Sequence, residues 1–183
     1  MRFHRKVFAG AAALALGVAS ALAADKPLQV NGDTLLISWK DGWSIGATPP
    51  QPSLAGAVTI HSGDPKKWRA IIAPLPPNPT LTGDVGNLRI YVRNMARGME
   101  NGGVDVDHEQ KSIDGSVAHG FYIKAHDPNP KLHVKGKDDP FSDGYTGALN
   151  IGGKPFLFEV VWNAGAEADA NAALAAMKTL RLR

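Results

Sequence analysis

The sequence predicts an α+β fold, in which an antiparallel sheet of about six or seven strands carries helices on its faces. Several short runs alternate apolar and polar residues and are separated by glycine-containing turns, a pattern typical of antiparallel strands. One longer run repeats its apolar residues at the helical period, and an alanine-rich run lies near the C-terminus. We therefore expect a mixed domain with strands in hairpins and at least one helix packed on the sheet.

The first predicted strands lie before residue 75. Leu35 to Trp39 and Trp43 to Thr48 flank Lys40-Asp41-Gly42, which we interpret as a three-residue hairpin connection with glycine at its left-handed position. Two further short strands are expected, from Ala57 to His61 and from Trp68 to Ala73.

The clearest helix is predicted from about Asp84 to Glu100, and Asn101-Gly102-Gly103 marks its end. Its apolar residues fall within one stripe, which consists of Leu88, Tyr91, Val92, Met95 and Met99. Away from that stripe, a basic residue recurs at every fourth position: Arg89, Arg93 and Arg97. This row is a candidate docking surface for an anionic partner, and the alternative is an ordinary solvated helix face.

An Asp114-Gly115 turn between two alternating runs predicts a tight hairpin with a fixed register. In that register Ser116 faces Ile113, and His108 and His119 are diagonal neighbours on an apolar face. The opposite face is expected to be solvated and carries Asp105, Asp107, Glu109 and Lys111.

The histidine pair has two interpretations. His108 and His119 are candidates for half of a metal site or for a pH-sensitive pair. Alternatively, both are partly buried side chains that hydrogen-bond to Gln110 or to backbone groups, because the sequence indicates no third and fourth ligand.

A second hairpin is predicted where Gly152-Gly153 joins a strand from Asp143 to Ile151 with one from Lys154 to Asn163. Its register places Gly147 opposite Phe158, where the glycine leaves room for the ring. This face is expected to belong to the core.

The chain ends with a predicted helix from about Ala166 to Lys178, followed by Thr179 to Arg183 as a short strand or extended tail. The helix has a narrow stripe of mostly small residues that would lie close on a sheet: Ala166, Ala170, Ala173, Leu174 and Met177.

Two segments rich in proline or glycine interrupt these elements. Pro74 to Gly83 should form an extended surface crossover, because proline lacks the N–H that a central strand needs. Asp127 to Gly144 is long enough to be either functional or mobile. Its charged residues are further candidates for partner binding: Lys135, Lys137, Asp138 and Asp139.

Residues 1–23 have the features of a secretory signal peptide. Arg2, Arg5 and Lys6 precede an apolar run from Val7 to Leu16, and Ala21-Leu22-Ala23 resembles a cleavage site. Residues 24–183 are expected to form one domain outside the cytoplasm, in the periplasm or secreted, with cleavage at Ala23 or Ala24. The mature form is not expected to span a membrane.

Charge and cysteine content exclude several classes of function. Residues 1–23 hold three of the 20 basic residues and none of the 17 acidic residues, so the mature chain is formally neutral. Net charge therefore gives no support to nucleic-acid binding. The absence of cysteine excludes disulfides, thiol catalysis, iron–sulfur clusters and cysteine-ligated zinc, and no cofactor motif is present.

The order of elements resembles the PsbP-like superfamily, which includes photosystem II PsbP, the Ran-binding Mog proteins and the DcrB-type bacterial envelope proteins. The resemblance rests on Gly42-Trp43 after a first strand, paired short strands, one long central helix, two hairpins and a last helix ending in Lys178-Thr179-Leu180. It implies an α/β/α sandwich with accessory or protein-binding roles and no catalytic residues to carry over.

Two functions follow as expectations. The first is an exported, non-enzymatic accessory or binding protein whose partner is an envelope or secreted protein. The alternative is a metal-dependent hydrolase or metal-binding protein that uses His108 and His119 with a loop carboxylate such as Asp138 or Asp143.

Overall fold

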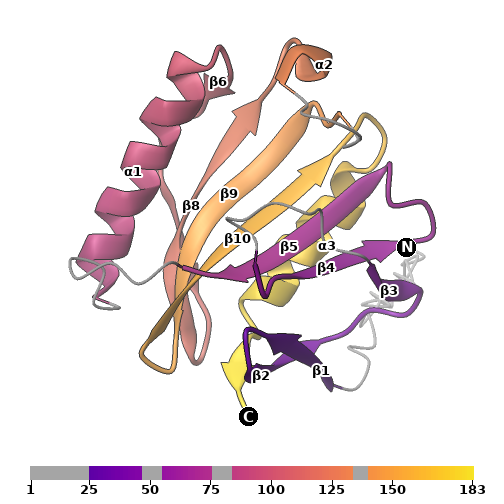
Figure 1. Ribbon diagram of the computed structural model, residues 1–183, viewed down its shortest axis with the longest axis vertical. Helices are drawn as coiled ribbons and strands as arrows, with labels where there is room; N and C mark the ends of the chain where they lie inside the picture. Colours follow the sequence, from indigo (N-terminus) through magenta and orange to yellow (C-terminus); the bar gives the residue numbers. More distant parts are fainter. Residues whose placement is uncertain (1–24, 47–54, 76–83, 134–139) are drawn as a thin grey trace, which may run out of the picture.

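The central feature of the computed structural model is an antiparallel sheet of eight strands (Figure 1). The structure describes residues 25–46, 55–75, 84–133 and 140–183. Along the sheet the strands are β3 (Trp43–Gly46), β4 (Val58–Ser62), β5 (Trp68–Pro74), β10 (Lys154–Trp162), β9 (Asp143–Ile151), β8 (Ala118–His126) and β6 (Asp105–Val106). β7 (Lys111–Asp114) also pairs with β8. The predicted α+β class with a large antiparallel sheet is confirmed.

A smaller sheet of three strands lies at one end of the large sheet (Figure 1). It consists of β1 (Asp25–Val30), β2 (Asp33–Ser38) and the C-terminal β11 (Arg181–Leu182), with β2 in the middle. The two ends of the described chain thus meet in one sheet.

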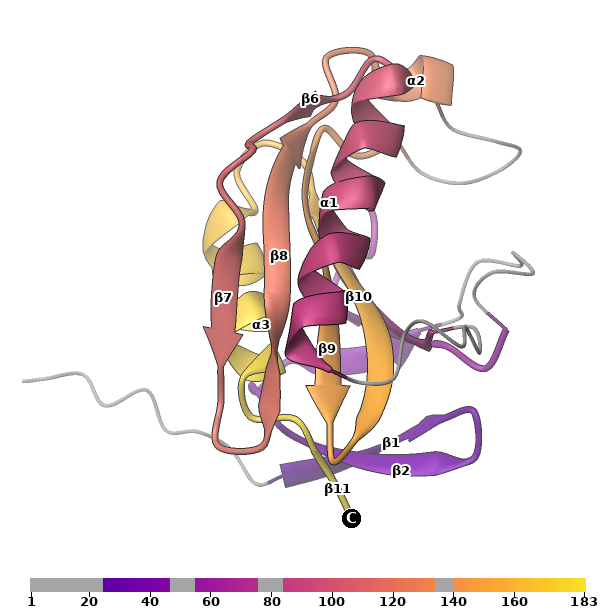
Figure 2. The ribbon, with the colours of Figure 1, turned by 90° about the vertical axis from the view of Figure 1, so that its left-hand side faces the viewer.

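The two longer helices lie on opposite faces of the large sheet (Figure 2). α1 (Val85–Asn101) covers β8 and β9, whereas α3 (Glu167–Met177) packs against β10 and β5 on the other side. α2 (Pro130–His133) is a single short turn. None of the helices in the described part of the chain is long and apolar enough to cross a membrane.

The start and end of α1 follow from its flanking residues. Asp84 is the N-cap, and its carboxylate accepts a hydrogen bond of 2.9 Å from the backbone N–H of Gly86. Gly103, with a φ of 87°, redirects the chain after the last turn. Leu88, Val92 and Ala96 are buried against the sheet, so the predicted apolar face is the packed one.

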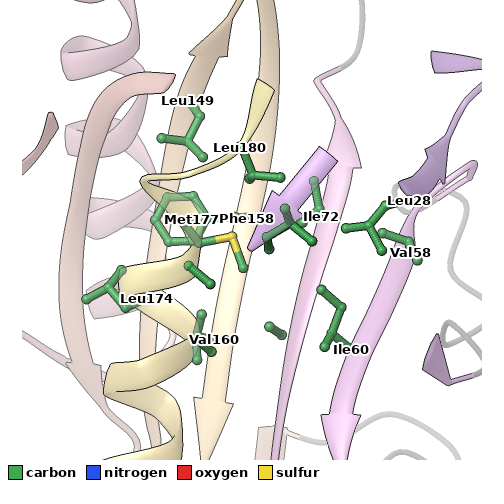
Figure 3. Close-up of a cluster of buried hydrophobic side chains, with 14 of the residues drawn as sticks. Leu28, Val58, Ile60, Ile72, Leu149, Phe158, Val160, Leu174, Met177 and Leu180 are labelled. Carbon is green, nitrogen blue, oxygen red and sulfur yellow. The ribbon is translucent and has the colours of Figure 1, made fainter. Parts of the chain in front are cut away.

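The larger core lies on the α3 side of the sheet (Figure 3). Phe158 and Val160 on β10 meet Leu174 and Met177 on α3, and Leu28 from β1 closes the cluster. All members of the predicted small-residue stripe on α3 are buried: Ala166, Ala170, Ala173, Leu174 and Met177. The expected helix and terminal strand are therefore confirmed.

The β9–β10 hairpin has the predicted register, with Gly147 opposite Phe158. A Cβ atom at residue 147 would lie 2.5 Å from Cε1 of Phe158 and 2.4 Å from the carbonyl oxygen of Phe121. The predicted role of Gly147, which is to leave room for the ring, is confirmed.

The predicted hairpin across Lys40-Asp41-Gly42 is wrong. The strand before it, β2, pairs with β1 and β11, whereas the strand after it, β3, pairs with β4 in the large sheet. Gly42 does adopt a positive φ of 83°, but it directs the chain from one sheet to the other. The true hairpin is β1–β2, where Asn31 and Gly32 both have positive φ, as a two-residue primed turn requires.

The predicted register of the β7–β8 hairpin is also wrong. Ile113 faces Gly120 instead of Ser116, and the Gly115 N–H donates to the carbonyl of Ala118 over 2.9 Å. Gly115 does not adopt positive φ. A Cβ atom on it would lie 2.0 Å from the carbonyl oxygen of Lys178. Glycine is needed here for the close approach of the end of α3, and not for a tight Asp-Gly turn.

A candidate anion-binding groove on helix α1

The arginine row of α1 borders a groove of about 380 Å³ between the helix and the β6–β7 segment. Arg89, Arg93 and Arg97 line it from the helix, together with Ala96 and Glu100. His108 and Gln110 line it from the opposite side, and Ile123 of β8 also contributes. Sequence reasoning treated the arginines and His108 as separate candidates, and the fold brings them together.

Arg89 ties the two sides of the groove together. Its Nε donates to Oε1 of Gln110 over 3.3 Å, and Nε2 of Gln110 donates to the Arg89 carbonyl over 3.1 Å. The guanidinium carbon also lies 5.4 Å from the ring centre of Phe121. These contacts join the β6–β7 segment to α1 across the groove.

His108 engages the acidic residue of the groove. Its Nε2 lies 2.8 Å from Oε1 of Glu100, and its side chain is 77% exposed. Among the described residues, Glu100 forms its ion pair with His108 and none with the arginines of the groove.

Arg93 and Arg97 are exposed and have no hydrogen bond or ion pair with any other residue that the structure describes. They lie one helical turn apart, which corresponds to a rise of about 6 Å. A guanidinium group presents several N–H donors in a plane and binds a carboxylate or phosphate through two of them. The groove is therefore suited to a ligand with at least two negative groups at a similar spacing.

The two histidines are not neighbours. His119 faces Asp114 on one side and Asn150 on the other, near the start of β8. His108 lies beyond Asp107, whose N–H bonds to the carbonyl of Lys124 near the end of that strand. The predicted diagonal pairing depended on the wrong register. In the ranges that the structure describes, no group of three or more His, Cys, Asp or Glu side chains is placed to hold a metal ion.

Asp143, one of the loop carboxylates considered as a metal ligand with His108 and His119, pairs with His126 instead. Its Oδ1 lies 3.0 Å from Nδ1 of His126, and its Oδ2 accepts a hydrogen bond of 2.7 Å from Ser142. The other predicted loop residues lie outside the described residues: Lys135, Lys137, Asp138 and Asp139.

Three residues with a role in the groove or beneath α1 could not be identified as site residues from the sequence: Glu100, Gln110 and Glu159. Glu100 and Gln110 are ordinary polar residues in the sequence, and their roles depend on how the helix docks against the β6–β7 segment. Glu159 lies on the α1 side of β10 between Leu157 and Val161. Its apolar neighbours on that face, Leu157 and Val161, indicate that part of the face is covered, but they do not indicate where α1 docks.

The arrangement defines a PsbP-like fold: a central antiparallel sheet with a long helix on one face and a shorter helix on the other. The structure is similar to the solution structure of cyanobacterial PsbP from Synechocystis sp. PCC 6803, with a TM-score of 0.52 and 13% sequence identity. The match covers 92% of this chain and 96% of that chain. At this identity the likeness establishes the fold. No known protein-family model matches the sequence, and no curated protein sequence does.

Proposed function

We propose that this chain is an exported, non-enzymatic accessory protein that binds an acidic segment of an envelope or secreted protein through the arginine groove. The observation that carries the proposal is the pair of exposed guanidinium groups, Arg93 and Arg97, beside a groove fixed by Arg89 and Gln110. The signal-like residues 1–23 support export of the chain.

An extended acidic segment matches the spacing of the two arginines. In an extended chain, side chains two residues apart point to the same side and are separated by about 6.6 Å. This is close to the rise of about 6 Å between residues four apart on a helix. Alternate acidic residues in a partner would therefore meet Arg93 and Arg97 in turn.

Site-specific photocrosslinking in cells tests this proposal. A photoreactive residue replaces Ile90, which is 54% exposed and lies on the same helix face as Arg93 and Arg97. The matched control replaces Ile45 on β3, at the far edge of the sheet, where the side chain is 53% exposed. We expect one product from position 90 alone, with the attachment site mapping to an acidic segment.

The same experiment in an Arg93→Gln Arg97→Gln background separates docking from chance contact. Loss of the product supports the proposal. Equal products from positions 90 and 45, or a product that persists without the two arginines, would reject it.

Export is tested separately by fractionation of cells that express the full chain. We expect the mature N-terminus in the exported fraction to begin after Ala23 or Ala24, as read by mass spectrometry. A chain that retains residues 1–23 in the cytosol would contradict the export part of the proposal.

A further inference from the structure

A second pocket of about 350 Å³ lies beyond the end of α1, over the start of β9. Its walls are largely apolar and include Met99, Val104, Ala125, Phe141 and Val161. Such a volume is in the range of small-molecule sites, which combine apolar walls with a few polar groups. None of the arginines of the α1 groove lines it, so it is a separate feature.

Two polar side chains enter this pocket side by side. Thr146 of β9 and Glu159 of β10 are directly opposed in the antiparallel register, so they point to the same face of the sheet. Thr146 is only 5% exposed. Neither side chain forms a hydrogen bond with another described residue. The Thr146 hydroxyl and the Glu159 carboxylate are therefore both free to bind a ligand in the pocket.

The charge that would attract a cation to this pocket comes from Glu159. Asp127 and Asp143 also line it, but Asp143 pairs with His126, and Asp127 accepts from the Asn129 N–H and has a further partner. The described lining residues include no lysine or arginine. Arg69 is the positively charged residue that acts on the Glu159 carboxylate, but the two form no ion pair among the described residues. The Arg69 guanidinium stacks on Phe141 instead, with its carbon 4.8 Å from the ring centre. Burial raises the pKa of Glu159, and Arg69 opposes this only in part. A ligand cation would favour the ionised carboxylate.

The geometry points to a binding site for a small organic amine, held as an ammonium ion by Glu159 and Thr146 with its alkyl part against the apolar walls. The ammonium group donates to the carboxylate of Glu159 and to the hydroxyl oxygen of Thr146. Binding requires no covalent step and does not depend on the arginine groove.

The test uses n-butylammonium as the probe and follows it by NMR on the isotope-labelled protein. n-Butanol and butyrate have the same alkyl chain with a neutral or a negative head group. We expect saturable shifts at Thr146, Glu159 and Val161 with n-butylammonium, and affinity at least about tenfold weaker for the other two compounds, because hydrogen bonds to charged groups are stronger than neutral ones.

Isosteric variants assign the binding to the two polar side chains. Glu159→Gln should weaken n-butylammonium binding roughly tenfold or more, and Thr146→Val should weaken it by a smaller factor. The control is Glu167→Gln, an exposed carboxylate of α3 outside the pocket. Circular dichroism confirms that each variant is folded. Absence of saturable binding, equal binding of butanol, or unchanged binding by Glu159→Gln would overturn the inference.

Discussion

Whether Glu159 is exposed or covered cannot be predicted from the alternation of residues along its strand. On β10 it alternates with Phe158 and Val160, which face the α3 core, so the pattern alone places it on the outer face. That face is covered in part by α1, and whether a given position is covered depends on where the helix docks. The side chain is therefore partly buried beside Leu157 and Val161.

The burial of Glu159 should make stability depend on pH. Its pKa is raised above the ordinary 4.5 by burial, with Arg69 opposing. Among the groups around it, Tyr91 has a pKa raised above its usual 10.0 by burial and by the charge of Glu159, and Asp127 and Asp143 line the same pocket. Below the ordinary pKa the carboxyl is protonated in both folded and unfolded chains. As pH rises through the folded-state pKa, the carboxyl loses its proton more readily in the unfolded chain than in the folded chain, so the free energy of unfolding falls.

The Glu159→Gln variant should lose this pH dependence. Urea unfolding from about pH 4 to pH 8 should show the variant gaining stability relative to the native protein as pH rises, because the amide carries no charge to desolvate. The exposed carboxylate Glu109 serves as the control, and Glu109→Gln should show no such trend. A constant difference between Glu159→Gln and the native protein over the whole range would contradict the assignment.

Gly147 is a residue whose role the sequence does predict. Gly147→Val should lower the free energy of unfolding by about 1–3 kcal/mol or more, because its side chain would meet Phe158 and the backbone at Phe121. Gly98→Ala, within α1, meets no atom within 4 Å and should raise stability by about 0.5–1 kcal/mol. Chemical denaturation of both variants checks the pair, and similar effects of the same sign would refute this assignment of the two glycines.

At the scale of elements, individual helices and strands follow from the sequence more readily than their pairing. The position of α1 follows from the Asp84 cap and the apolar stripe. The hairpin predicted across Lys40-Asp41-Gly42 was wrong because a positive φ at Gly42 allows a sharp turn of the chain but does not determine which strand β3 pairs with. The Asn31-Gly32 signal for the true first hairpin is present in the sequence.

The joint between α3 and the smaller sheet gives a prediction at this scale. The Thr179 hydroxyl oxygen accepts from the Ser38 N–H over 2.9 Å and donates to the Ala176 carbonyl over 2.7 Å. Thr179→Val should cost about 1–3 kcal/mol, because the Ser38 N–H loses its partner, whereas Thr179→Ser should be nearly neutral. Thermal and urea unfolding measure both variants. A loss in Thr179→Ser that equals or exceeds the loss in Thr179→Val would contradict the dominant role assigned to the hydroxyl.

At the scale of the whole molecule, the sequence predicts the layers but not the second sheet. The large antiparallel sheet, the long helix on one face and the final helix on the other all appear as expected. The three-stranded sheet was not predicted, because β11 has only two residues and pairs with β2 at the other end of the chain. Such long-range pairings have no local signature.

The groove likewise combines a local signal with a contact between distant elements. The repeat of Arg89, Arg93 and Arg97 is visible in the sequence. The opposite wall, with His108 and Gln110, depends on the path of the chain between β6 and β7. The predicted register of the β7–β8 hairpin placed this segment incorrectly.

The central claim is that Arg93 and Arg97 recognise alternate acidic groups on an extended segment. Fluorescence anisotropy with a labelled peptide carrying glutamate at alternate positions tests it most directly, with a lysine peptide of the same length as the control. We expect binding of the acidic peptide alone, weakened by salt, since exposed charges are screened. Arg93→Gln Arg97→Gln should reduce it by roughly tenfold or more, whereas Arg183→Gln at the exposed C-terminus should not. Binding that is equal in the double variant, or no preference for the acidic peptide, would contradict the claim.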